Sequence, residues 1–147
     1  MAPLVVLVVA SIAFWLAGRL GVTTFQYFGT VLRTALALMF LLTASAHWGK
    51  RRPDLIRMVP PQLPHPGLLV TISGVLEIAG AIGLLIPSTA PPACICLALL
   101  LLALFPANVR AARENLTIAG HPVPGIMTRT AIQIVFVVAL VSAAVLK

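Results

Sequence analysis

The stretch GLLVTISGVLEIAGAIGLLIP, residues 67–87, decides the fold because it is strongly apolar and carries one charged side chain, Glu77. As a helix, its 21 residues would extend about 31 Å, which matches the roughly 30 Å hydrocarbon core of a bilayer. Glu77 is the eleventh of these residues and would lie at the bilayer centre. A carboxyl group at that depth is costly against lipid, so it is expected to face protein or a wet cavity.

A helical wheel of residues 67–87 separates small from large side chains. Glu77 shares its face with Ser73, Gly74, Gly80 and Ala81, whose small size lets a second helix approach closely. The opposite wall consists of bulky residues suited to lipid contact, namely Leu68, Ile72, Val75, Ile82 and Ile86. The pattern predicts that Glu77 points into a helical bundle.

The composition of the whole chain indicates an integral membrane protein. Of its 147 residues, 61% are hydrophobic and 9% are charged, whereas a water-soluble domain has roughly 25% charged residues. Five apolar segments are long enough to cross a bilayer as helices. They are residues 3–18, 31–48, 67–87, 91–108 and 126–146. We predict an all-α helical bundle that forms a single membrane domain over residues 1–147. A signal peptide is the alternative interpretation of residues 3–18.

The net charge of +7 is explained by membrane topology and anionic lipid headgroups rather than by nucleic-acid binding. Seven basic residues lie in or beside the loops 49–66 and 109–125, and three lie on the other side. The seven are Lys50, Arg51, Arg52, Arg57, Arg110, Arg113 and Arg129, and the three are Arg19, Arg33 and Lys147. This asymmetry predicts that both loops are cytoplasmic and that Lys147 is outside.

The proline-rich segment 50–66 is expected to lie along the membrane surface. Its prolines disfavour helix, so its second half should be extended and stiff. Leu55, Ile56 and Met58 are expected to dip into the interface.

Three further polar residues are candidate partners of Glu77 in a buried cluster. His47 ends the second span, Asn108 ends the fourth, and Gln133 lies about two turns into the fifth. The cluster has three readings: structural contacts between helices, a pocket for a ligand, or a proton or redox relay. The spacing of the histidines matches no metal-ligand pattern, so no metal site is predicted.

Four motifs together resemble the DoxX family of small bacterial membrane proteins, over residues 33–140. They are RTALALMFLLTASAHW, RMVPPQLPHPGLLVTISGVLEIAGAIGLLIP, FPANVRAARENLTIAGHPVP and QIVFVVAL. The resemblance implies a four-helix core made by spans two to five, to which this chain adds an N-terminal span. The family is named after a subunit associated with thiosulfate:quinone oxidoreductase, so the resemblance implies an accessory subunit of a membrane oxidoreductase system.

Three functions follow as expectations. The first is an accessory subunit that binds a quinone or a soluble redox enzyme and is not a stand-alone enzyme. The second is a binder or transporter of a lipid-like small molecule, with Glu77 in its pocket. The third is a structural assembly protein. Homo-oligomers are compatible with each of them, and no cofactor other than a quinone is expected.

Overall fold

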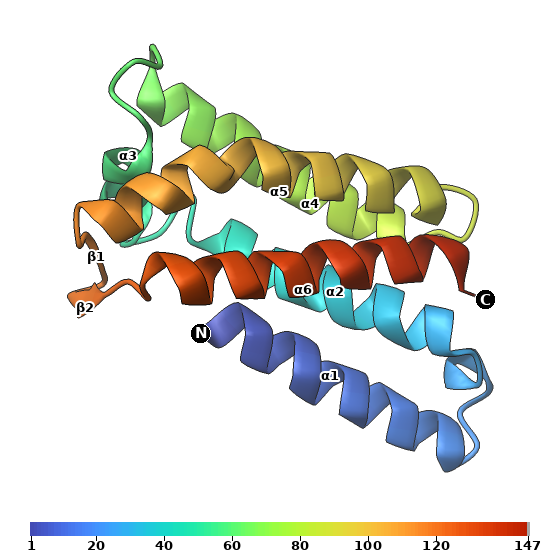
Figure 1. Ribbon diagram of the computed structural model, residues 1–147. Coiled ribbons are helices and arrows are strands. Elements are labelled where there is room, and N and C mark those ends of the chain that lie inside the picture. The colour runs from blue at the N-terminus through green and yellow to red at the C-terminus, as the bar shows by residue number, and fades with distance from the viewer. Residues whose placement is uncertain (147) are drawn as a thin grey trace.

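The computed structural model describes residues 1–146, which form six α-helices and confirm the all-α class (Figure 1). Five of the helices are long and apolar enough to cross a membrane. They are α1 (Ala2–Arg19), α2 (Phe28–Ser45), α4 (Pro66–Leu85), α5 (Ala90–Arg113) and α6 (Ile126–Val145). The shorter elements are the 3-10 turn η1 (Thr23–Phe25), helix α3 (Arg52–Met58) and the strands β1 (Thr117–Ile118) and β2 (His121–Pro122). The predicted position of Lys147 lies outside the described residues.

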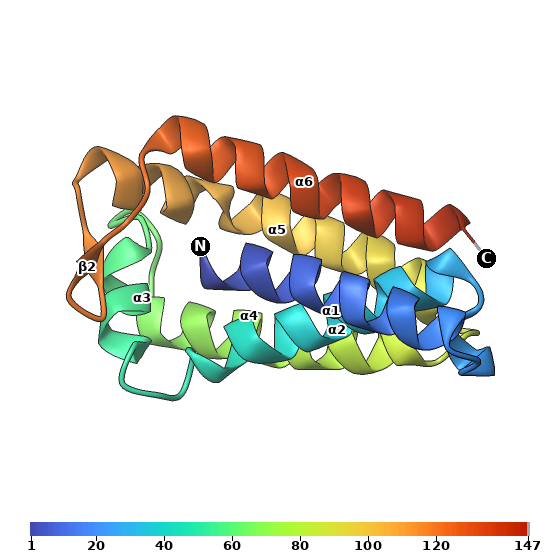
Figure 2. The same ribbon diagram turned by 90° about the horizontal axis from the view of Figure 1, so that it is seen from below.

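Four of the long helices make a closed bundle. α2 packs against α4 and α6, and α5 packs against the other sides of α4 and α6. α1 lies along α2, on the outside of this bundle (Figure 2). α2 is therefore the central helix, and its Ala35, Leu36 and Phe40 are at most 1% exposed. α1 adds Leu7 and Ala10 to the same core.

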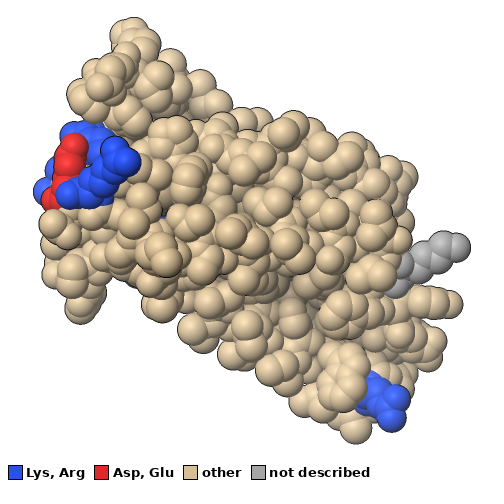
Figure 3. Space-filling view, viewed as in Figure 1, with Lys and Arg blue, Asp and Glu red and all other residues tan. Residues whose placement is uncertain are grey.

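The outer wall of α4 faces away from the protein, as the helical wheel predicts. Its five bulky side chains are 46% to 57% exposed, although all of them are aliphatic. Charged side chains gather at the two ends of the face shown in Figure 3. An uncharged apolar belt between charged ends is what a bilayer requires of a spanning bundle. The chain is a multi-pass membrane protein in contact with lipid.

Both long loops lie at the same end of the bundle, beside α3 and the β1–β2 hairpin (Figure 1). α3 begins with a proline in its first turn, where the missing N–H costs no hydrogen bond. The expectation for Met58 is wrong, because this side chain is 7% exposed and is buried by protein rather than by the membrane interface.

A carboxylate joins α3 to the hairpin. The N–H of Ala119 donates to Asp54 Oδ2 over 2.8 Å, and Arg57 pairs with the same side chain. These two donors hold the pKa of Asp54 below its usual range. The contact is therefore present above the ordinary carboxyl pKa and is lost as the pH falls through the lowered value.

The other end of the bundle is held by Arg33 of α2. Its Nε donates to the carbonyl of Ala143 over 2.9 Å, and its second nitrogen donates to the carbonyl of Leu146 over 2.7 Å. The last carbonyls of a helix have no partner within the helix, so Arg33 satisfies two of them at the end of α6. In the sequence, Arg33 counts only as one of the charges that indicate the membrane topology. Its contacts show that it also has a structural role.

Candidate functional site

Helix α4 presents Glu77 to the interior of the bundle. Its side chain is 5% exposed, and Ser73, Gly74 and Ala81 on the same face are also buried. α2 packs directly on this face. The small residues therefore let the two helices approach, and a carboxyl group is enclosed between them.

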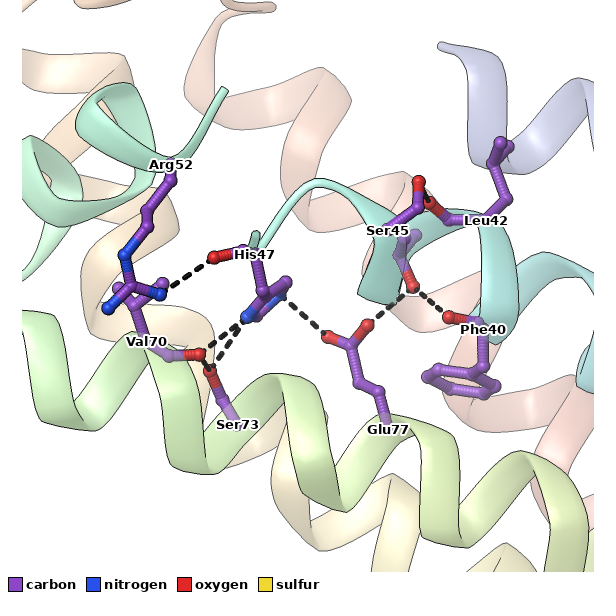
Figure 4. Close-up of polar contacts among 9 residues, drawn as sticks. Phe40, Leu42, Ser45, His47, Arg52, Val70, Ser73 and Glu77 are labelled. Carbon is purple, nitrogen blue, oxygen red and sulfur yellow. Dashed lines mark hydrogen bonds and ion pairs between the residues drawn. The ribbon is translucent and has the colours of Figure 1, made fainter. Parts of the chain in front are cut away.

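His47 lies two residues after the end of α2 and is 7% exposed. Its Nδ1 lies 2.6 Å from the carbonyl oxygen of Val70, about two turns before Glu77 on α4. A carbonyl only accepts hydrogen bonds, so Nδ1 must carry the proton and donate it. This assignment leaves His47 Nε2 as the nitrogen that faces Glu77 (Figure 4).

Glycine at position 74 makes this placement of the imidazole ring feasible. A Cβ atom on Gly74 would lie 2.7 Å from Cγ of His47 and 2.8 Å from Nδ1. Both distances are much shorter than an ordinary van der Waals contact. The histidine ring thus occupies the space that a side chain at position 74 would fill.

The carboxyl group of Glu77 has a partner for each oxygen. Thr43 Oγ1 lies 2.6 Å from Oε2, and His47 Nε2 lies 3.5 Å from Oε1. Thr43 Oγ1 also lies 2.9 Å from the carbonyl oxygen of Phe40, and Oε1 and Nε2 can share one proton. With the proton on the histidine, the pair is an ion pair; with the proton on the glutamate, both groups are neutral. The pair has no net charge in either form, which lowers the cost of burying it in a membrane.

Arg52 fixes the backbone of this site from outside. Its guanidinium donates to the carbonyl of His47 over 2.7 Å, and to the carbonyl of Gly67 and the hydroxyl of Thr71 over 2.9 Å each. Gly67 and Thr71 belong to the first turns of α4. Arg52 therefore joins the segment after α2 to the start of α4, and so contributes to the position of His47.

Asn108 and Gln133 form a separate contact between α5 and α6. The Asn108 amide lies 3.4 Å from Gln133 Oε1, and the Gln133 amide donates to the carbonyl of Leu101 over 2.9 Å. Arg129 donates to Asn108 Oδ1. Within residues 1–146, no hydrogen bond links this group to Glu77 or His47. The four predicted residues thus form two pairs, one on each side of the bundle.

Three residues of the Glu77 site were not predicted as site residues: Thr43, Ser73 and Arg52. Ser73 Oγ lies 3.3 Å from His47 Nδ1 and also donates to the carbonyl of Val70. A signal for two of them is present in the sequence, because Thr43 and His47, like Ser73 and Glu77, are four residues apart. This spacing puts each pair on one face of its helix or helix end.

The chemistry open to this site is limited by its contacts. Two hollows of about 250 Å³ each lie in the protein surface, and they are lined by residues of α1, η1 and the stretch that ends at Phe28, the first residue of α2. Neither hollow reaches Glu77. Among the described residues, no three histidine, cysteine or acidic side chains gather as metal ligands would. The site is a closed set of contacts between α2 and α4.

Five long apolar helices, four of which form a bundle that encloses buried polar residues, define a helical, multi-pass membrane protein. The chain belongs to the family described as Domain of unknown function (DUF8561), whose model matches residues 36–145. The match starts within α2 and ends with α6, so it includes both polar pairs. It makes no DoxX assignment. No curated protein and no solved structure matches the chain.

Proposed function

We propose that the protein is a non-catalytic accessory subunit of a membrane redox system, in which the Glu77–His47 pair locks α2 against α4. The observation that carries this proposal is the closure of the site. Both carboxyl oxygens of Glu77 have protein partners, and His47 Nδ1 donates to a backbone carbonyl. These contacts already tie the polar groups of the site to the protein, which favours a structural role over a ligand pocket at Glu77.

The redox assignment rests on the resemblance to DoxX proteins, which implies an accessory subunit of a membrane oxidoreductase. The bundle would support such an enzyme at the membrane, with a quinone arriving through the lipid. Leu7 and Ala10 of α1 pack into the core of the bundle. This packing favours α1 as a membrane span of the protein, in addition to the four of the bundle, over a signal peptide that is removed. A bacterial inner membrane with both long loops in the cytoplasm agrees with the basic residues at that end.

In this proposal, the redox enzyme docks on the end of the bundle that α3 and the hairpin form. Lys50, Arg51 and Arg113 are exposed there, and no hydrogen bond or ion pair joins their side chains to the rest of residues 1–146. α3 is held to the bundle by Arg52 and to the hairpin by Asp54. A rigid surface with exposed cations fits a soluble redox enzyme with an acidic face.

Purification from native membranes tests this proposal. The tagged full-length chain, extracted in mild detergent, should co-purify with a flavin- or iron–sulfur-containing enzyme that reduces quinone. Reversing two charges, with Lys50→Glu and Arg51→Glu together, should abolish this association because the docking surface loses its positive charge. Exchanging the same residues, with Lys50→Arg and Arg51→Lys, keeps the charge and should keep the enzyme. A wild-type chain that elutes without any redox cofactor would contradict the proposal.

A further inference from the structure

The opposite end of the molecule carries two adjoining surface hollows between α1 and the start of α2, which together we call the groove. Its apolar part, about 250 Å³, is lined by Ser11, Ile12, Trp15 and Phe28. Its polar part, also about 250 Å³, exposes more polar than apolar surface. The polar part is lined by Trp15, Gly18, Arg19, Phe25 and Gln26. Trp15 lines both parts, so the apolar part lies next to the polar part.

The shape of this groove is set by close packing. The rings of Phe14 and Phe25 stack with their centres 4.7 Å apart, which holds η1 against α1. A Cβ atom on Gly18 would lie 2.2 Å from the carbonyl oxygen of Phe25, so only glycine permits this approach. η1 and the end of α1 therefore form a fixed wall, at the turn between α1 and α2 (Figure 1).

The polar part of the groove is positively charged. Arg19 is exposed at the end of α1, and within residues 1–146 its side chain makes no hydrogen bond or ion pair. No acidic residue lies near it in the fold: Asp54 and Glu114 belong to the end with α3 and the hairpin, and Glu77 is buried in α4. An anion is the complementary ligand for such a site.

The aromatic residues around the groove are of the kind that contact lipids at the membrane interface. Trp15, Tyr27 and Phe28 are 49%, 62% and 53% exposed, and aromatic residues of this kind gather where acyl chains meet headgroups. Each part is smaller than the pockets of about 300–1,000 Å³ that hold whole small molecules. Each part would therefore hold a portion of a larger molecule, such as a segment of an acyl chain or a headgroup phosphate.

We infer that this groove binds an anionic phospholipid. One acyl chain lies in the apolar part, against Ile12, Trp15 and Phe28. The lipid phosphate lies in the polar part, where Arg19 supplies the positive charge and the Gln26 amide supplies a hydrogen-bond donor. The lipid covers the outside of α1 and holds η1 at the non-cytoplasmic surface. This inference is independent of the redox proposal, because the two concern opposite ends of the molecule.

Tryptophan fluorescence in bilayers tests the inference. The chain has two tryptophans, so the Trp48→Phe variant leaves Trp15 as the only reporter. The full-length variant is reconstituted in phosphatidylcholine that contains a small fraction of lipid with brominated chains, which quench tryptophan on contact. Quenching of Trp15 should show that brominated phosphatidylglycerol binds the groove about fivefold more tightly than brominated phosphatidylcholine does. This ratio is the equivalent of roughly 1 kcal/mol from one basic residue.

Two variants complete the test. Arg19→Gln in the Trp48→Phe background should remove the preference for phosphatidylglycerol while leaving Trp15 accessible to both lipids. Arg113→Gln, an exposed arginine at the other end, is the matched control and should leave the preference at Trp15 unchanged. Equal quenching by the two lipids, or a preference that survives Arg19→Gln, would overturn the inference. Failure of both lipids to quench Trp15 would also overturn it, because lipid chains would then not contact the groove.

Discussion

Glu77→Leu is expected to destabilise the bundle by about 1–3 kcal/mol, because it leaves the buried Nε2 of His47 without a partner. The Thr43 hydroxyl also loses its contact with the carboxyl group but keeps the carbonyl of Phe40, 2.9 Å away. Unfolding by sodium dodecyl sulfate in mixed micelles, followed by helical circular dichroism, measures the change in the free energy of unfolding.

Glu77→Gln is the matched control for this prediction. The glutamine carbonyl can accept from Thr43, and its amide can donate to His47 Nε2 without any shared proton. The free energy of unfolding should therefore stay within about 0.5 kcal/mol of the wild-type value. If Glu77→Gln folded normally but lost the function of the protein, the ionisable proton itself would be needed, and the structural account of the pair would be wrong.

Gly74→Ala should have an effect of similar size for a steric reason. The added methyl group would lie 2.7 Å from the His47 ring, which Val70 and Glu77 hold in place. Overpacking of this kind costs about 1–3 kcal/mol. The ¹⁵N shifts of the His47 imidazole, recorded by magnetic resonance, should also change because the ring must leave its hydrogen bond to Val70.

Gly67→Ala provides a control on the same helix. A Cβ atom at position 67 would be 3.8 Å from its nearest neighbours in Arg52 and Ile56, which is ordinary contact. This variant should be as stable as the wild type or slightly more stable, because alanine favours helix over glycine. Equal stability of Gly74→Ala and Gly67→Ala would contradict the close approach of α2 and α4.

The fold was predictable because membrane spans are specified by local properties. Length and apolar composition are enough to indicate five helices, and the wheel of residues 67–87 separates the buried face of α4 from its exposed wall. Met58 shows the limit of this reasoning. The apolar residues of a surface helix can face lipid or protein, and the packing of α3 against α4 and α5 decides this for Met58.

The candidate site was less predictable because its contacts cross between helices. Depth in the membrane singled out Glu77, His47, Asn108 and Gln133, but depth does not tell which helices are neighbours. The structure places α2 beside α4 and α5 beside α6, which separates these residues into two pairs. The roles of Arg33 and Arg52 could not be foreseen either, since most of their partners are backbone carbonyls, which the sequence does not distinguish.

A double-mutant cycle on Glu77 and His47 tests the central claim, that these two side chains lock α2 to α4. The free energy of unfolding is measured for Glu77→Leu, for His47→Leu and for the double variant. Each single variant leaves one buried polar group unpaired, whereas the double variant removes both members of the pair. We predict a coupling energy of about 0.5–3 kcal/mol, with the double variant losing less stability than the sum of the two single losses. Additive losses would contradict the account, because they would show that the two residues act independently.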